Sequence, residues 1–502
     1  MIEVYSLTCR CGSARSRVEW VDARSTADHL IHLRSQLRTC THIRLSRARM
    51  RVETWTKKPP AYHAAALVVT LLPLYYGSYQ FRLTHPYGGA EASVAIEPAA
   101  SGDFVSQWLD VHTVEPFNPS AIASYCNRTE WHPNLVFNLD NANGGIGNVR
   151  DNILDFIFFA LEAGASIILP GMASRSPTDI SNVWADRAPF DRMFDETWFL
   201  WAIKEACPQM AVYKPEKDQK LSDALPGKYL PRSRRMDDDR GYSKSAYVGD
   251  LDNWLKTKAE FQPDNLTLVN LERTLWDVDT RSLPQGLRRN IGQLLRVNPT
   301  VRRLAATVVR NLATKYRLQI DPRDAIPKGA FFGAHLRTEA DARNAGWLNE
   351  PNTNFSAQTD AYIQHALKHK LKVMYVASGN VSNLELFRAK AATHVPPLNI
   401  TSKLDLLDSG ALDALMQLTW DQRALVDYEV LLRCSVFGGF VKSSFSYNIA
   451  MSRNQWLEDH GRVTDPWFVM HEEVGVAFDD GISRVLARDA FHERRIPRGM
   501  WP

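Results

Sequence analysis

One short stretch, residues 135–170, constrains the fold more than any other. LVFNLD (135–140) is an apolar run of strand length, NANGGIGN (141–148) is a glycine-rich turn, and VRDNILDFIFFALEAGA (149–165) has apolar residues at helical spacing. SIILP (166–170) then returns to a buried strand. Strand, helix and strand in this order form a βαβ unit, which predicts a parallel sheet with a ligand crevice at the carboxyl ends of its strands.

A second set of strand and helix patterns follows after a polar middle region. Its strands and helices are expected at residues 329–337, 359–370, 371–378, 411–434 and 443–453. The middle region, residues 214–279, contains the charge run RSRRMDDDRGYSK and is expected to be solvated. The order predicts an α/β protein with two doubly wound, Rossmann-like halves that face a cleft.

The composition excludes several classes of protein. Of the 502 residues, 45% are hydrophobic and 23% charged, which excludes a wholly disordered or collagen-like chain. The formal net charge of +4 is nearly balanced and argues against a nucleic-acid binder. The cysteines lack repeated CxxC pairing, so no zinc cluster is expected. They are Cys9, Cys11, Cys40, Cys126, Cys207 and Cys434.

The N-terminal region has the pattern of a membrane anchor. Residues 61–81 (AYHAAALVVTLLPLYYGSYQF) contain no Asp, Glu, Lys or Arg and predict a single transmembrane span, with a buried core helix as the alternative. Residues 1–60 are basic and predict a largely disordered cytosolic tail. The positive-inside rule then places the rest of the chain in a lumen, with residues 82–134 as a stem and domain edge.

Two further features fit a lumenal location. Five glycosylation sequons follow the span, at Asn127, Asn265, Asn354, Asn380 and Asn399. In an oxidising lumen the three cysteines after the span predict one disulfide and one free thiol, with the pairing left open. We therefore expect a single-pass protein of the Golgi or endoplasmic reticulum membrane. Translation from Met50 would leave a shorter basic tail.

The glycine-rich turn is the first segment that can bind a ligand. Its glycines, including Gly145 and Gly147, lie between a strand and a helix. Backbone N–H groups and the helix dipole at this place favour an anionic or oxygen-rich ligand. The turn lacks the third glycine of the dinucleotide fingerprint and the lysine of a P-loop, so a purely structural turn is the alternative.

The second segment is HLRTEAD, residues 335–341, directly after a buried strand. Arg337 suits phosphate because its planar guanidinium donates two parallel hydrogen bonds, and Asp341 is placed to orient it. In the alternative reading, His335 is a core residue and Arg337 makes a structural ion pair with Glu339 or Asp341.

The third segment is a group of serines, Ser443, Ser444 and Ser446, where a strand gives way to a helix. Hydroxyl groups and unpaired N–H groups at such a junction form an anion cradle, although serines there are often simple N-caps. Three segments that each bind phosphate or sugar oxygens predict a phosphate-bearing donor in the cleft between the halves.

At these residues the chain resembles the protein O-fucosyltransferase family and its relatives, including the α1,6-fucosyltransferases. GGIGN (144–148) is similar to the family's glycine-rich segment, and HLRTEAD to its HLR segment. In the stretch from Asp427 to Ser446, an aspartate followed by FGG and then SSFS resembles the donor-binding segment. The resemblance implies a GT-B fold, GDP-fucose as donor, inversion at the sugar carbon, and no metal or other cofactor.

The resemblance also implies roles for single residues. Arg337 would bind the β-phosphate of the donor, Asp341 would support Arg337 or the nucleotide, and Asn148 and His335 would lie beside fucose. The remaining donor-binding residues would be Gly145, Gly147, Asp427, Ser443, Ser444, Phe445 and Ser446. Residues 135–325 would form the acceptor-side domain and residues 326–502 the donor-binding domain.

Several points stay open at this level. The general base is unassigned, with Asp151 and Glu339 as candidates, and the acceptor is either a protein or a glycan. A metal-dependent GT-A transferase that uses Asp237 and Asp239 is one alternative. A non-catalytic lumenal protein that binds a sugar nucleotide or a glycan is the other.

Overall fold

The computed structural model divides into two units, Met1–Glu97 and Pro98–Pro502, which are described separately. The structure describes residues 5–11, 14–20, 42–46, 104–111, 116–176, 179–214, 224–231, 244–462, 475–487 and 499–502.

The first unit contains a small antiparallel sheet. Its strands are β1 (Tyr5–Cys11), β2 (Ala14–Trp20) and β3 (His42–Ser46), in the order β2-β1-β3. These strands fall within residues 1–60, for which the basic composition predicted a largely disordered tail. Met50 and the predicted span at residues 61–81 lie outside the described residues.

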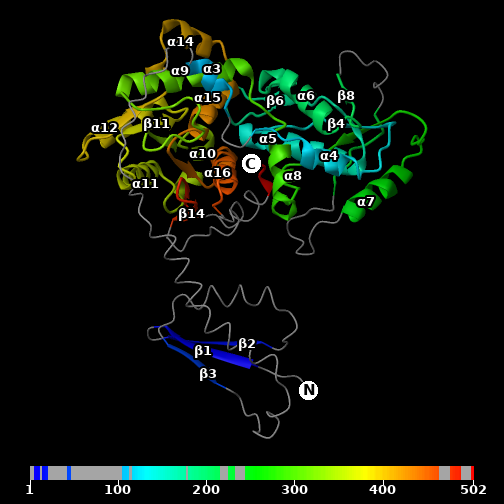
Figure 1. Ribbon diagram of the computed structural model, residues 1–502, viewed down its shortest axis with the longest axis horizontal. Helices are drawn as coiled ribbons and strands as arrows, with labels where there is room; N and C mark the ends of the chain where they lie inside the picture. Colours follow the sequence, from blue (N-terminus) through cyan, green and yellow to red (C-terminus); the bar gives the residue numbers. More distant parts are fainter. Residues whose placement is uncertain are drawn as a thin grey trace. The chain divides into compact units, whose positions relative to one another are not determined.

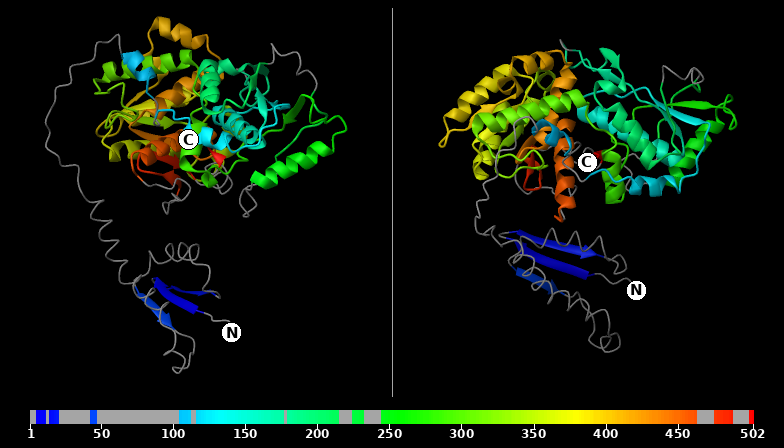
Figure 2. Two further views of the ribbon diagram at one scale, coloured as in Figure 1. Left: turned by 45° about the vertical axis from the view of Figure 1, so that its right-hand side comes forward. Right: turned by 45° about the horizontal axis from the view of Figure 1, so that its top comes forward.

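Among its described residues the second unit contains two larger sheets and one hairpin. We call the parts built around the two larger sheets the N-half (residues 116–297) and the C-half (α3 and residues 299–487). In Figure 1 the N-half is mainly cyan to green and the C-half mainly yellow to orange. The turned views in Figure 2 keep the two colour groups apart, except for α3 and α9.

The N-half is built on a four-stranded parallel sheet in the order β8-β5-β4-β9. Its strands are β4 (Leu135–Leu139), β5 (Ser166–Ile168), β8 (Val212–Tyr213) and β9 (Thr267–Leu271), with a separate hairpin of β6 (Met172–Ser174) and β7 (Asp186–Ala188). Its helices are α4 (Ser120–Cys126), α5 (Ile146–Ala163), η2 (Phe190–Arg192), α6 (Glu196–Ala206), α7 (Lys244–Lys256), η4 (Thr280–Ser282) and α8 (Gln285–Gly292). Because α5 connects the parallel strands β4 and β5, the predicted βαβ unit is confirmed.

The C-half is built on a six-stranded sheet in the order β12-β11-β10-β13-β15-β14, parallel except for β14. Its strands are β10 (Phe332–His335), β11 (Val373–Ala377), β12 (Asn399–Thr401), β13 (Val436–Phe440), β14 (Val476–Asp479) and β15 (Ser483–Leu486). Its helices are α3 (Phe104–Leu109), α9 (Pro299–Tyr316), α10 (Ala340–Asn344), η5 (Trp347–Asn349), α11 (Phe355–Lys368), α12 (Val381–Ala392), α13 (Lys403–Leu406), α14 (Ser409–Met416), α15 (Trp420–Leu432) and α16 (Ser444–Asp459). The expected α/β class is confirmed.

Three expectations differ from the observed elements. The single helix predicted at residues 411–434 is two helices, α14 and α15, because Thr419 starts α15 with a capping box to Gln422. The polar middle region, residues 214–279, contains α7 and β9, so part of it belongs to the sheet. Residues 104–109 and 120–126, predicted as stem and domain edge, are the packed helices α3 and α4.

The contacts of α9 put the boundary between the two halves before this helix, whereas the sequence predicted it after residue 325. Helix α9 contacts α15, α13 and α3. Arg433 at the end of α15 donates to the carbonyl oxygens of Trp108, Pro322 and Asp324 at 2.8, 2.5 and 2.8 Å. These contacts attach α3 and α9 to the C-half.

Helices α5 and α16 meet where the two halves join, near the middle of the unit in Figure 1. Residues 499–502 add to this junction. Arg150 of α5 donates to the carbonyl oxygens of Trp501 and Pro502 at 2.8 and 2.6 Å. The Trp501 indole N–H donates to Asp155 Oδ1 at 2.7 Å. Helix α5 is therefore held on several sides, which fixes the glycine turn at its N-terminus.

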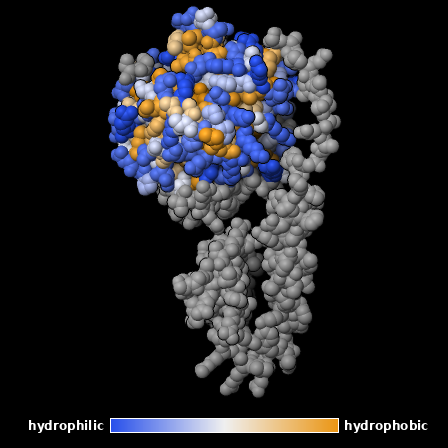
Figure 3. Space-filling model, turned by 90° about the vertical axis from the view of Figure 1, so that its left-hand side faces the viewer, coloured by the Kyte–Doolittle hydropathy of each residue, from blue (hydrophilic) through white to orange (hydrophobic). Residues whose placement is uncertain are grey.

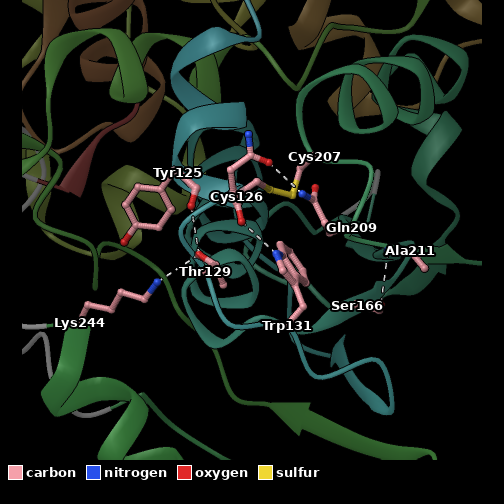
Figure 4. Close-up of a disulfide and its surroundings, with 10 residues drawn as sticks. Tyr125, Cys126, Thr129, Trp131, Ser166, Cys207, Gln209, Ala211 and Lys244 are labelled. Carbon is pink, nitrogen blue, oxygen red and sulfur yellow. Dashed lines mark hydrogen bonds between the residues drawn. A yellow bond between two sulfur atoms is a disulfide. The ribbon is translucent and has the colours of Figure 1, made fainter.

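A disulfide joins Cys126 of α4 to Cys207, just after α6, with a Cα–Cα distance of 5.7 Å and a sequence separation of 81 (Figure 4). The Trp131 indole N–H donates to the Cys126 carbonyl oxygen at 3.0 Å beside this bridge. Cys434 is free and buried. The cysteines after the predicted span therefore form one disulfide and leave one thiol, as expected.

Hydrophobic residues are interspersed with hydrophilic ones on the face drawn in Figure 3. Within the described ranges, we find no helix that is both long and apolar enough to cross a bilayer.

Candidate active site

A cavity of about 590 Å³ lies between the N-half and the C-half, a size typical of small-molecule sites. It is lined by residues at or after the ends of β4, β6 and β9 in the N-half and of β10, β11, β12 and β13 in the C-half. Ten of the predicted site residues line it, namely Gly145, Asn148, His335, Arg337, Glu339, Asp341, Asp427, Ser443, Ser444 and Phe445. Three segments that are far apart in sequence therefore contribute to one cavity.

The three other predicted residues do not line the cavity. A Cβ built on Gly147 would lie 2.7 Å from the carbonyl oxygen of Ser444, so this glycine lets α5 approach α16. Ser446 lies behind the wall, where its Oγ hydrogen-bonds to His335 Nδ1 at 2.8 Å and accepts the Phe440 N–H at 2.9 Å. Asp151 is fully buried in α5.

The glycine turn shapes the N-half wall. Gly144 has a φ of +106°, and a Cβ there would lie 2.6 Å from Asn148 Nδ2, so the turn requires glycine. Asn148 Oδ1 is buried without a hydrogen-bond partner among the described residues. An unsatisfied acceptor in a cavity wall is suited to a ligand hydroxyl.

Arg337 lies between two carboxylates. Its Nη1 donates to Glu339 Oε2 and its Nη2 to Asp341 Oδ2, both at 2.6 Å. The side-chain amide of Gln358 holds the Arg337 backbone by accepting its N–H at 3.0 Å and donating to its carbonyl oxygen at 3.1 Å. A guanidinium has five N–H donors, so these pairs orient Arg337 and leave donors for a ligand. The structural ion pairs of Arg337 are therefore compatible with a role in binding a ligand.

The two carboxylates beside Arg337 are held in the ionised form. Burial acts to raise the pKa of Glu339, but the Arg337 charge and the Gly379 N–H, which donates at 2.7 Å, outweigh it and lower that pKa. Burial likewise acts to raise the pKa of Asp341, and the hydrogen bond from Arg337 outweighs it. Ionised carboxylates with lowered pKa values are weak proton acceptors.

His335 is neutral at physiological pH. Burial lowers the pKa of its imidazole to about 4, with the Glu339 charge opposing this shift. Its ring centroid lies 4.6 Å from that of Phe445. The site thus presents a neutral, hydrogen-bonding ring beside the charged Arg337 cluster.

Asp427 is fixed at the C-half end of the cavity. The Tyr375 hydroxyl donates to its Oδ1 at 2.7 Å, and Lys403 forms an ion pair with its Oδ2. The carboxylate faces the cavity in a defined orientation.

Several charged and aromatic residues of the cavity were not predicted from the sequence. These are Arg175, Arg273, Trp276, Trp347, Lys403, Trp420, Asp421, Arg423 and Lys442. Trp276 has a φ of 58°, a costly backbone conformation for such a residue, and strain of this kind is concentrated at functional sites.

The loop that carries Trp276 is held by α5. Asn152 Oδ1 accepts the Thr274 N–H at 3.0 Å, and Asp155 Oδ2 accepts the Asp277 N–H at 2.9 Å. Buried polar side chains of α5 therefore position this part of the N-half wall.

Among the described residues, no group of three or more His, Cys, Asp or Glu side chains is placed to bind a metal ion. Asp237 and Asp239, the alternative metal ligands, lie outside the described residues.

Comparisons with solved structures give similar chains at low identity. POFUT1 in complex with GDP is 14% identical, with 64% of this chain and 96% of that chain covered and a TM-score of 0.38. POFUT1 in complex with GDP-fucose is 13% identical, with 66% and 96% covered and a TM-score of 0.40. The fucosyltransferase NodZ from Bradyrhizobium is 13% identical, with 65% and 93% covered and a TM-score of 0.34.

No protein of curated function matches the chain. The sequence profile described as GDP-fucose protein O-fucosyltransferase matches residues 135–455, which include the glycine turn, the HLR segment and the serine segment. The chain therefore belongs to the GDP-fucose protein O-fucosyltransferase family and is a glycosyltransferase.

Proposed function

We propose that this protein transfers fucose from GDP-fucose to a hydroxyl group of a protein or glycan acceptor, with inversion and without a metal ion. The observation that carries the proposal is that Arg337, Ser444 and the glycine turn line the same cavity. In this reaction the acceptor oxygen forms a bond to the anomeric carbon while the bond from that carbon to the β-phosphate oxygen breaks. Negative charge then develops on the departing GDP.

Arg337 is placed to stabilise that charge. Glu339 and Asp341 fix its guanidinium, and the donors that remain are available to the diphosphate. Groups held ready for developing charge are usually the largest single contribution to catalysis, and removal of one donor costs about 2.7–4 kcal/mol in the transition state.

The serine segment would bind the same diphosphate. Ser443 is the N-cap of α16, yet its side chain makes no capping hydrogen bond, and Ser444 begins the helix. Both line the cavity, so their hydroxyl groups and the helix N-terminus can face an anion. In the glycine turn, Asn148 Oδ1 would accept a hydrogen bond from a fucose hydroxyl.

The charges of the cavity support metal-independent transfer. Among the described residues its cationic side chains are Arg175, Arg273, Arg337, Lys403, Arg423 and Lys442, and its carboxylates are Glu339, Asp341, Asp421 and Asp427. Lys442 also pairs with Glu350, which does not line the cavity. The cations around Arg337 can meet a diphosphate in place of a divalent ion. The proposed donor chemistry therefore rests on arginine and lysine side chains.

Of the two candidate bases, Glu339 lines the cavity and Asp151 does not. The lowered pKa of Glu339 makes it a weak base while it is paired with Arg337. We therefore leave the group that receives the acceptor proton unassigned.

We further propose that residues 98–502 lie in the lumen of the Golgi or endoplasmic reticulum, anchored by the span at residues 61–81. The Cys126–Cys207 disulfide supports an oxidising compartment. The sequon residues Asn127, Asn265, Asn354 and Asn399 are exposed and open to glycosylation, and Asn380 is half-buried. Removal of N-glycans from the protein isolated from its own cells should increase its electrophoretic mobility, and unchanged mobility would argue against this location.

The transferase proposal is tested by a hydrolysis and transfer screen of sugar nucleotides with the full chain. GDP-fucose should be the preferred donor, and a chelator should leave its turnover unchanged. Loss of activity in chelator that manganese restores would contradict metal independence. Preference for a donor other than GDP-fucose would contradict the assigned substrate. Parallel assays with peptide and glycan acceptors identify the acceptor class, and NMR of the product tests inversion.

A further inference from the structure

Arg175 is an N-half residue that reaches the C-half. It follows β6, and its Nη1 lies 3.4 Å from Asp341 Oδ2. Its backbone N–H donates to Asp421 Oδ2 at 3.2 Å, and its Nε lies 3.8 Å from Asp421 Oδ1. Both carboxylates belong to the C-half wall of the cavity. One side chain therefore links the two halves through two carboxylates.

The same guanidinium also lies over the glycine turn. A Cβ built on Gly145 would approach Arg175 Nη2 to 3.3 Å, closer than an ordinary contact. Arg175 Nη1 donates to the carbonyl oxygen of Ile180 at 3.0 Å, which fixes the guanidinium in this place. Arg175 thus contacts the glycine turn and the HLR segment at once.

The positive charge of Arg175 affects Arg337 through the Asp341 carboxylate that both residues contact. Asp341 Oδ2 is shared, since Arg337 Nη2 donates to it at 2.6 Å and Arg175 Nη1 lies on it from the other half. Arg337 alone faces two negative charges, those of Glu339 and Asp341. A second cation on Asp341 offsets the extra negative charge, which would otherwise repel a diphosphate. It also limits where the Asp341 carboxylate can move.

We propose that Arg175 is a positioning residue that fixes Asp341 and, through it, the Arg337 guanidinium, so that the donor site is complete only when the N-half contacts the C-half. This inference rests on the proposed function. Arg175 does not itself need to touch the donor. Its effect is on the orientation of Arg337, and misplacement of a catalytic group by about 1 Å can cost about 10²-fold in rate.

The test is a kinetic comparison of Arg175→Ala, Arg175→Lys, Asp341→Asn and the double variant R175A/D341N. Arg175→Ala should lower kcat for GDP-fucose turnover by about 10- to 100-fold, with a smaller change in KM. Arg175→Lys should recover part of the loss because it keeps the charge on Asp341. The double variant should be no slower than the slower single variant, since both changes act through one carboxylate. Arg187→Ala, an exposed arginine of β7, is the matched control and should leave kcat unchanged.

Two results would overturn the proposal. If the losses of Arg175→Ala and Asp341→Asn multiply in the double variant, Arg175 acts on the donor directly and not through Asp341. If Arg175→Ala lowers the melting temperature but leaves kcat and KM unchanged, its role is structural only. Failure of the proposed function is a separate outcome, in which the unmodified chain neither binds GDP in calorimetry nor turns over GDP-fucose.

Discussion

The two walls of the cavity are built in different ways. In the C-half, Arg337 and Ser444 lie within a few residues of the ends of the buried strands β10 and β13. In the N-half, Arg175 and Trp276 lie on separate loops, and the loop of Trp276 is held by buried polar side chains of α5. Site residues that follow a buried strand can be predicted from the sequence. Site residues on a loop that tertiary contacts hold in place cannot, because those contacts form only in the folded protein.

The largest expected effect is at the C-half wall. Arg337→Ala should lower kcat for GDP-fucose turnover by about 10²–10³-fold, because charge on the departing GDP loses its oriented donor. Steady-state kinetics with the folded variant measures this. The matched control is Arg343→Ala, an exposed arginine of α10 outside the cavity, which should change kcat little. Full activity of Arg337→Ala would remove the C-half wall from the mechanism.

The next effect concerns the N-half and is one of stability. Cys207→Ser removes the disulfide to Cys126, which joins residues 81 apart, and should lower the free energy of unfolding by about 2–4 kcal/mol. Urea denaturation followed by tryptophan fluorescence measures the loss. A reducing agent should destabilise the unmodified chain to a similar degree and have little effect on the variant. Equal stability of both proteins would contradict a formed disulfide.

A smaller effect is expected where the two walls meet. Gly147→Ala places a Cβ 2.7 Å from the Ser444 backbone, and such overpacking should cost about 1–3 kcal/mol of stability and move α5 away from α16. Gly249→Ala is the matched control, because Gly249 lies in α7 with open space around its Cβ position. That change should raise stability by about 0.4–1 kcal/mol. If both substitutions behave alike in thermal denaturation, the contact between the halves is not tight.

The smallest effect is in the pH dependence of stability. Burial lowers the pKa of His335 to about 4, so between pH 6.5 and about 4 the unfolded state takes up a proton that the folded state does not. Stability should therefore fall as the pH decreases through this range, and His335→Gln should remove that part of the slope. Urea midpoints at several pH values measure it.

Asp151 in α5 supplies the opposite case. Burial raises its pKa to about 8, with the Arg150 charge opposing the shift, so the folded state keeps a proton that the unfolded state releases above about pH 4. Its contribution to stability should be lost as the pH rises toward 8, and Asp151→Asn should remove that loss. The part of the pH slope of stability that His335→Gln removes should be opposite in sign to the part that Asp151→Asn removes. Equal signs would contradict this contrast between the halves.

Much of the C-half could be predicted from the sequence for a physical reason. Strands of a parallel sheet are buried on both faces and therefore read as apolar runs, as in β10 and β11. The polar residues that follow such a run must emerge at its carboxyl end, which is why Arg337 was identified.

In the N-half, the glycine turn with Gly145 and Asn148 was predicted, but the loops that carry Arg175, Arg273 and Trp276 were missed because the strands before them are less distinct. Strand β9, TLVNL, lies in the polar middle region expected to be solvated, so Arg273 and Trp276 after it were not considered. Arg175 follows the short strand β6, and its partners Asp341 and Asp421 are far away in sequence. No local pattern indicates such contacts, because they depend on how the halves pack.

The buried thiol of Cys434 gives the C-half a chemical label that the disulfide-bonded cysteines of the N-half do not provide. Its Sγ lies against Gly333 and donates to the Leu431 carbonyl oxygen at 3.0 Å, and burial raises its pKa, so a thiol reagent should reach it only when the C-half opens. The N-half cysteines, Cys126 and Cys207, form a disulfide and do not react with the reagent. Alkylation followed by peptide mapping would time the opening of the C-half alone, and comparison with fluorescence would reveal whether the two halves come apart together.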